Sequence, residues 1–587
     1  MALVRSLLTF EPAGWRPVSA LLRFLGVSVA VAVGMYFGGR GGAVLAGLGA
    51  LYAGMASFGG VHQARLKRMV AATTAASLTT LVGCMVGPSD LWTVITVAIG
   101  AFTLSLLAAA GADAAQVATQ AVAILVVLAG VKGSHDHPLG NAALVLGGGF
   151  GQAAILMLFH PISPVAAERR ALEAVYLGLG RFARHLGKDG PLPSAAPHAA
   201  ARDLMRSAFG YGSRPELEKL WMELELADAI RGNLSGLVRT GASEEAWIAL
   251  ADWLDAGADD IARGRPVIRK CPPLTGEDEG EAGPWLRRIR AIIEAEEGGR
   301  LPVGVPAPRS WLAAMRNVEA VRALALGHAL RYAVAVSAAT ALYRYFKIDH
   351  GYWAALAVAF SLRADFATTV FRSIGRIVGT SLGVLLATAF VFLIHPTTTS
   401  LTLGMLGAVW VAFALQNATY VGFSAGLAFY VVMSVTLSGM AFSTVGLERI
   451  GATAAGSLFA LTIAIVWPSW EASKTRTVLA VAFATQAEYA LAVAEVQDPE
   501  TMNAFRFRAR GARLEAERLI NAAGFEPRWS RRRHLEGAND ALARLAENAA
   551  RILAVHVLVL DHDDKPAIDD LRRLAAEDRH VAADLMG

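Results

Sequence analysis

Long apolar stretches occupy two regions of this chain, and each is followed by a region in which apolar and polar residues alternate at helical spacing. The run from Ile377 to Leu447 contains no Asp, Glu, Lys or Arg. About 20 apolar residues suffice for one helix to cross a bilayer, so this run must hold several spans. The pattern predicts an all-α membrane protein with about twelve spans, six in each apolar region.

Charges, glycine and proline mark the ends of the predicted spans. The least certain is 350–366, because it contains Arg363 and Asp365; it is either a short span or one whose last turn lies in the membrane interface. The predicted spans are 18–38, 42–60, 69–87, 91–110, 114–131, 139–159, 326–345, 350–366, 374–394, 400–416, 420–440 and 447–467.

Two pairs of arginines indicate that the apolar regions are copies of each other. Arg23 and Arg68 are 45 residues apart, as are Arg331 and Arg376, and an offset of 308 carries the first pair onto the second. The same offset pairs identical apolar residues without a gap, such as Leu22 with Leu330. Because six spans return the chain to its starting side, the copies are expected to be parallel repeats.

The polar regions read as helical domains. In 215–237 the apolar residues recur every three or four positions, as on one face of an amphipathic helix. No stretch alternates with the period of two that a strand needs. We therefore predict a first transmembrane block at 1–163, a helical domain at 164–325, a second transmembrane block at 326–468 and a C-terminal helical domain at 469–587.

Composition and charge narrow the location. The chain has 55% hydrophobic and 18% charged residues, against about 25% charged in an average soluble protein. Lys and Arg in short loops gather on one side of the predicted spans, which predicts a multi-pass protein of a bacterial inner membrane with both termini and both helical domains in the cytoplasm. A net charge of +5 without a basic, aromatic-containing stripe gives no case for nucleic-acid binding.

Several features of the second block resemble the fusaric acid resistance-like family of inner-membrane proteins. They are Arg331 in the opening helix, Tyr352 and Trp353 in the next, Arg372 and Arg376 before Gly379, Thr380 and Gly383, and Arg449 at the last span. The first block keeps only Arg23 and Arg68. The resemblance implies an efflux pump for aromatic carboxylic acids, with a possible periplasmic membrane-fusion partner. Distant similarity to plant malate channels leaves a passive anion channel as an alternative function.

The arginines are the first candidates for a substrate site, because an arginine within an apolar helix is costly and tends to be functional. Arg331, Arg372 and Arg376 could hold a carboxylate in a bidentate fork. Alternatively, Arg331 and Arg376 could reach lipid phosphates at the helix ends, which is also the favoured reading for Arg23 and Arg68. Arg363 and Arg449 are further charges at or within predicted spans.

Two acids could carry the proton that drives export. Asp365 lies at the predicted membrane boundary, where it could also simply pair with Arg363 or Arg372. Asp113 opens the fifth span, where it could equally be a helix N-cap. Both residues are candidates for proton coupling.

Aromatic and small residues complete the candidate site. Tyr352 and Trp353 could stack on an aromatic substrate or belong to the aromatic belt at the outer interface. Thr380 is a further candidate substrate contact. Gly379, Thr380 and Gly383 place small residues on one helix face, which favours close helix packing.

These patterns favour a proton-driven secondary exporter of small organic anions that is embedded in the lipid bilayer and could form a homodimer. The alternatives are a passive organic-anion channel and a non-transporting envelope scaffold. We expect no enzyme, no cofactor and no metal site, since 134–137 (Ser-His-Asp-His) lacks a fourth ligand and no ATP-binding motif is present.

Overall fold

The computed structural model is built from helices throughout its described part, and no strand occurs there. The all-α prediction is therefore confirmed for these residues. The described residues are 15, 17–57, 62–107, 112–131, 135–159, 165–184, 196–209, 215–240, 243–267, 270–275, 282–294, 319–394, 397–437, 439, 442–467, 474–495, 499–524, 526, 535, 537–558 and 565–586.

The chain divides into two compact units. We call the first the membrane unit; it comprises Met1–Phe58, His62–Ile162 and Arg309–Ser469. Its helices are α2 (Pro17–Met55), α3 (His62–Val86), α4 (Asp90–Leu107), α5 (Ala112–Gly130), α6 (Pro138–Leu158), α13 (Glu319–Tyr345), α14 (Tyr352–Ser361), α15 (Phe366–Ile394), α16 (Thr398–Leu415), α17 (Tyr420–Leu437) and α18 (Phe442–Val466).

Nine helices of the described chain are long and apolar enough to cross a membrane, which identifies a multi-pass membrane protein. Two of the twelve predicted spans, 18–38 and 42–60, lie largely in α2, which breaks at Gly38 and Gly39. Gly39 has φ of +59°, a backbone conformation that glycine adopts without steric cost. The break folds α2 back on itself, so that Gly34 before it packs against Gly42 after it. A Cβ on either glycine would overlap the carbonyl oxygen of the other.

The helix within the span predicted at 350–366 is shorter than that span. The helix there, α14, has ten residues, which extend about 15 Å, half of the roughly 30 Å hydrocarbon core. Four non-helical residues, 362–365, separate it from α15. Arg363 and Asp365, the two charges that make this span uncertain in the sequence, both lie in the interruption.

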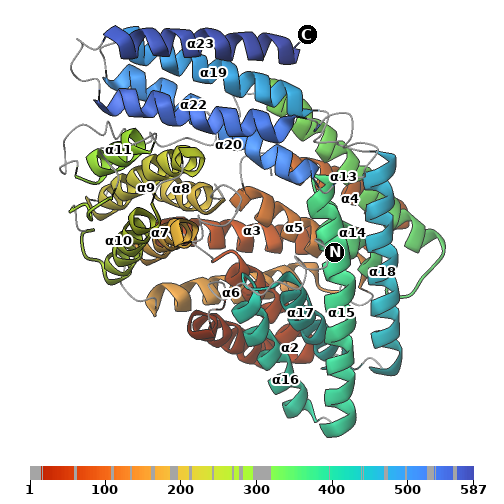
Figure 1. Ribbon diagram of the computed structural model, residues 1–587. Coiled ribbons are helices and arrows are strands. Elements are labelled where there is room, and N and C mark those ends of the chain that lie inside the picture. The colour runs from red at the N-terminus through yellow and green to blue at the C-terminus, as the bar shows by residue number, and fades with distance from the viewer. Residues whose placement is uncertain are drawn as a thin grey trace. The chain divides into compact units, whose positions relative to one another are not determined.

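The ends of several helices follow the offset of 308 residues. Asp90 and Leu107 of α4 map onto Thr398 and Leu415, the ends of α16. Packing between the two halves is reciprocal: α13 packs against α4, while α2 packs against α16 (Figure 1). Within each half, α3 packs on α5 and α6, as α15 packs on α17 and α18.

The second unit comprises Gly59–Val61, Ser163–Pro308 and Trp470–Gly587, so the segments predicted as two helical domains are grouped together. Its helices are α7 (Ala166–Arg184), α8 (Ala196–Phe209), α9 (Pro215–Thr240), α10 (Glu244–Arg263), α11 (Gly283–Ile293), α19 (Thr475–Glu495), α20 (Pro499–Ala523), α22 (Ala538–Leu558) and α23 (Lys565–Met586).

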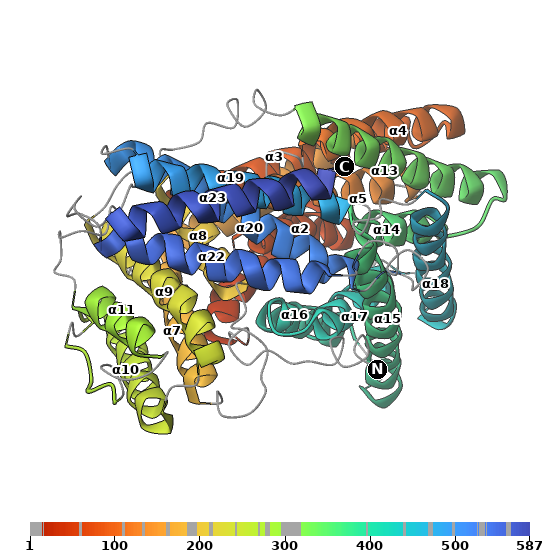
Figure 2. The same ribbon diagram turned by 45° about the horizontal axis from the view of Figure 1, so that its top comes forward.

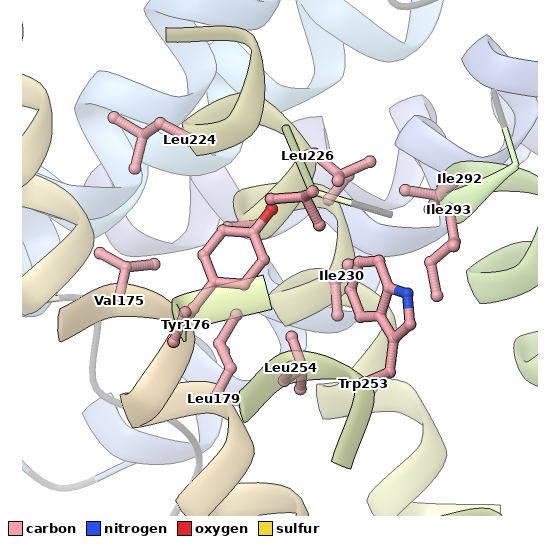
Figure 3. Close-up of a cluster of buried hydrophobic side chains, with 14 of the residues drawn as sticks. Val175, Tyr176, Leu179, Leu224, Leu226, Ile230, Trp253, Leu254, Ile292 and Ile293 are labelled. Carbon is pink, nitrogen blue, oxygen red and sulfur yellow. The ribbon is translucent and has the colours of Figure 1, made fainter. Parts of the chain in front are cut away.

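Apolar packing builds this second unit around two centres. In the first, Tyr176 of α7, Ile230 of α9 and Trp253 of α10 point into a shared core (Figure 3). In the second, α19 packs against α20, α22 and α23 (Figure 2). Helix α19 is also among the nine helices apolar enough for a span. Its apolar character suits a central helix, because a helix that is covered on all sides is hydrophobic all round.

Candidate functional site

The break between α14 and α15 is held by an arginine from α13. Arg331 is 3% exposed. It donates from Nη2 to the carbonyl oxygens of Arg363 (2.7 Å) and Ala364 (3.0 Å), and from Nη1 to that of Trp467 (3.0 Å). The last carbonyls of a helix lack partners within the helix. Arg331 supplies donors to the carbonyls just past the end of α14, and its two terminal nitrogens are already engaged.

The first half contains a related contact. Arg23, 308 residues before Arg331, donates from Nε to Ser57 Oγ (2.9 Å). Ser57 in turn donates to the carbonyl oxygen of Gly54. Ser57 is the residue that the offset places opposite Asp365, so both arginines contact the end of the helix that follows them. Arg68 is half-buried and lies on α3.

Asp365 begins α15. Its Oδ1 accepts a hydrogen bond from the backbone N–H of Thr368 (2.7 Å), which is the arrangement of a helix N-cap. Its neighbour Arg363 donates from Nη1 to Thr119 Oγ1 on α5 (2.9 Å). The side chain of Asp113, the other predicted proton carrier, lies outside the described residues, although its backbone belongs to α5.

Two other arginines differ from Arg331 because no hydrogen bond or ion pair joins their guanidinium groups to another described residue. Arg376 of α15 is 9% exposed and Arg449 of α18 is 4% exposed. The Nε atom of each is buried without a hydrogen-bond partner, and within the described chain no ion pair joins an acid to either. The two guanidinium groups are near enough to repel each other electrostatically, and both interact with Tyr52 of α2.

Aromatic rings cover both guanidinium groups. The Cζ atom of Arg376 lies 4.6 Å from the ring centroid of Phe360, and that of Arg449 lies 5.2 Å from the centroid of Trp353. Both rings belong to α14. Cation–π contact of this kind holds a guanidinium at a defined position while leaving its N–H groups free to donate. We call Arg376, Arg449, Tyr52, Trp353 and Phe360 the arginine cluster.

Trp353 is buried, with 3% exposure, and Tyr352 is buried with 6%. Trp353 therefore does not lie at the surface as a belt residue would. Its ring stacks on His350, with centroids 4.9 Å apart and planes 18° apart. His350 Nδ1 lies 2.6 Å from Glu448 Oε2. The carboxylate of Glu448, the acid nearest in sequence to Arg449, is therefore engaged by His350.

Arg372 and Thr380 lie one turn before and one turn after Arg376 on α15. Arg372 is half-buried, and its Cζ lies 5.3 Å from the ring centroid of Tyr420, so it contacts a different ring from Arg376. Thr380 is 2% exposed. A Cβ on Gly379 or Gly383 would overlap α17 at Val421 or Ala425, which agrees with the predicted role of these glycines in close packing.

Sequence reasoning missed Tyr52, Phe360 and the His350–Glu448 pair. A usable signal was present for Tyr52, because the offset of 308 maps it onto Phe360. Phe360 contacts the guanidinium group of Arg376, and Tyr52 is near enough to it for an electrostatic interaction, so each half contributes one aromatic residue close to this group. No comparable signal announces the pairing of His350 with Glu448, since 98 residues separate them.

Metal ligands are not gathered anywhere in the part of the chain that the structure describes: no three His, Cys, Asp or Glu residues lie close enough to hold an ion. The candidate site of the membrane unit therefore consists of guanidinium groups, which are cationic hydrogen-bond donors, beside aromatic rings. Such an arrangement can bind an anion that carries an aromatic group.

Comparisons with known proteins agree with this description. An uncharacterized protein of Haemophilus influenzae is 29% identical over 154 residues, a match that covers 24% of this chain and 20% of that protein. The matched part thus spans a fifth of that relative. No solved structure matches. Residues 337–463, which include Arg376, Arg449, Trp353 and Phe360, match the family described as fusaric acid resistance protein-like. This segment of the chain is therefore similar to the fusaric acid resistance-like family, as the motifs of the second block predicted.

Proposed function

We propose that this protein is a secondary exporter of organic anions, chiefly aromatic carboxylates, in a bacterial inner membrane, and that the proton gradient drives it. The observation that carries the proposal is the arginine cluster: two buried guanidinium groups with no acidic partner among the described side chains, each against an aromatic ring. A buried charge without compensation is unfavourable by several kcal/mol. A bound carboxylate would remove that penalty.

The residues of the proposed site have different roles. Arg376 and Arg449 would bind carboxylate through their N–H groups, while Trp353 and Phe360 would border the substrate's ring. Thr380, Tyr352 and Arg372 extend the site along α14 and α15. Arg331 is a positioning residue in this proposal, because its terminal donors already bind carbonyls beside the break.

The two halves would act as parallel repeats, with a pathway near the pseudo-symmetry axis between them. Tyr52 and Phe360, which the offset of 308 relates, both interact with Arg376, and this supports a site near that axis. Both termini and the second unit are proposed to be cytoplasmic. By family resemblance, a periplasmic membrane-fusion protein would receive the substrate, and the protein could act as a homodimer.

The test is efflux of a preloaded hydroxybenzoate from cells with and without the protein, each with and without an uncoupler. Arg376→Gln should abolish protein-dependent efflux. Arg40→Gln is the matched control, because Arg40 is exposed and its hydrogen bond within the described chain goes to Thr398, the first residue of α16. Normal efflux by a correctly inserted Arg376→Gln protein would refute the proposed site.

A passive organic-anion channel is the second candidate, and one observation favours it. The carboxylate of Asp365 caps α15, and this structural role accounts for the residue without proton transfer. If efflux follows the anion gradient and ignores the uncoupler, the protein is a channel and the arginine cluster lines its pore.

A further inference from the structure

The substrate can be specified further from the charges of the arginine cluster, provided that the proposed function holds. The cluster contains two positive charges rather than one, and both are more than nine-tenths buried. A monocarboxylate would neutralise only one of them. The other would remain buried, desolvated and repelled by its neighbour, which is the costly situation that a buried ion pair avoids.

Among the described residues of the membrane unit, no ion pair joins an acid to Arg376 or Arg449, and three of its acids have other partners. Asp90 binds Arg344 (2.7 Å), Asp365 caps α15, and Glu448 binds His350 (2.6 Å). Glu448 directly precedes Arg449 in sequence, yet its side chain is 39% exposed and directed to the histidine. The protein thus leaves both guanidinium groups for a ligand.

Helix α14 supplies the ring that covers each cation. Trp353, which covers Arg449, and Phe360, which covers Arg376, are seven residues apart on this helix. Seven residues are two turns and about 10 Å along the axis, so the two rings lie on the same helix face at different heights. The two cations therefore lie against separate rings, and each can receive a carboxylate of its own.

We infer that the arginine cluster binds a dianion, an aromatic dicarboxylate, with one carboxylate on Arg376 and the other on Arg449. The ring of the ligand is bordered by Trp353 and Phe360, the two rings that cover these cations.

The experiment uses the full-length protein in lipid vesicles, with terephthalate, phthalate and benzoate as probes at equal concentration. Terephthalate and phthalate, the two dianions, should each be transported about tenfold better than benzoate, the factor that one additional charge-assisted contact supplies. In Arg449→Gln the preference for terephthalate over benzoate should fall to about one, since only one cation remains. Arg449→Lys keeps the charge and should retain part of the preference.

A binding measurement separates this inference from a defect in folding. Terephthalate should raise the thermal unfolding temperature of the detergent-solubilised wild type, and it should not do so for Arg449→Gln. Without ligand, Arg449→Gln should be at least as stable as the wild type, because it removes an uncompensated buried charge. Arg40→Gln should behave as the wild type in both assays.

The outcomes distinguish the two proposals. Benzoate transport that equals terephthalate transport, and that still needs Arg376, would overturn the dianion inference and leave the exporter in place. Binding of two benzoates per chain with unaltered terephthalate preference in Arg449→Gln would also overturn it. Transport of none of the probes, together with no thermal shift, would remove both the dianion inference and the proposed function.

Discussion

Arg331 Nη2 donates to the carbonyl oxygen of Arg363 over 2.7 Å and so joins the middle of α13 to the break between α14 and α15. The same guanidinium reaches Ala364 and Trp467. A three-way contact of this kind needs the planar fork of arginine. The break carries Asp365 and directly precedes the helix of Arg376, so this contact fixes the geometry on which the proposed site depends.

Arg331→Lys should therefore destabilise the membrane unit although it preserves the charge. Lysine cannot donate in the same fork, and each buried carbonyl left without a donor costs about 1–3 kcal/mol. We expect a lower thermal unfolding temperature in detergent and faster hydrogen exchange in peptides that cover 362–368. Unchanged exchange there would show that Arg331 does not hold the break.

Asp365 can be tested for proton coupling separately from capping. Asparagine is as good an N-cap as aspartate but does not titrate, whereas alanine loses the cap at a cost of about 1 kcal/mol. If Asp365 only caps α15, Asp365→Asn should keep uncoupler-sensitive efflux and Asp365→Ala should lose stability. If Asp365 carries the proton, Asp365→Asn should be folded but unable to export. Efflux and thermal unfolding of both variants decide between these roles.

Features that depend on local composition could be predicted from the sequence, whereas features that depend on tertiary contacts could not. The spans, the repeat offset and the cationic helix α15 come from local composition, and Arg376 and Arg449 were named from it. The charges Arg363 and Asp365 mark the end of α14 in the sequence, but the contact that stabilises the interruption comes from Arg331, more than 30 residues earlier. The proximity of Phe360 and Tyr52 to Arg376 is tertiary, and in the sequence only the repeat offset relates these two aromatic residues.

Close packing of α15 on α17 gives a third prediction. A Cβ on Gly383 would overlap the carbonyl oxygen of Ala425, which is backbone and cannot move aside, whereas Gly451 on α18 has open space around it. Gly383→Ala should therefore lower the unfolding temperature and reduce efflux. Gly451→Ala should be neutral or stabilising by about 0.5–1 kcal/mol, the helix preference of alanine over glycine. Equal effects of the two substitutions would contradict the packing described here.

The fourth prediction concerns a buried ionic network in the second unit. Glu225 of α9 is fully buried and accepts hydrogen bonds from Arg510 (2.6 Å) and Arg506 (3.0 Å) of α20. Arg202 of α8 lies 3.6 Å away. Because α8 and α9 belong to 163–308 and α20 to 470–587, this network joins the two chain segments that make up the unit.

Burial opposes ionisation of Glu225, but the charges of Arg510, Arg202 and Arg506 together outweigh it and lower the pKa of Glu225 to about 2. A carboxyl whose pKa is lower in the folded than in the unfolded state stabilises the fold above its unfolded pKa, and this stabilisation is lost as the pH falls through the folded value. The contribution of Glu225 should thus be complete at neutral pH and decline from about pH 4.5 towards pH 2.

Glu225→Gln should therefore destabilise the second unit at pH 7 by roughly 3 kcal/mol, because it leaves buried arginines without their counter-charge. The difference from the wild type should shrink as the pH is lowered towards 2, since protonation then makes the same change in the native side chain. Hydrogen exchange of peptides from α9 and α20 in the full-length protein measures this locally. Glu216→Gln, at an exposed position of the same helix, should show neither effect. A constant difference between Glu225→Gln and the wild type across this pH range would mean that Glu225 is not ionised in the folded protein, and that the arginines are held in place by packing alone.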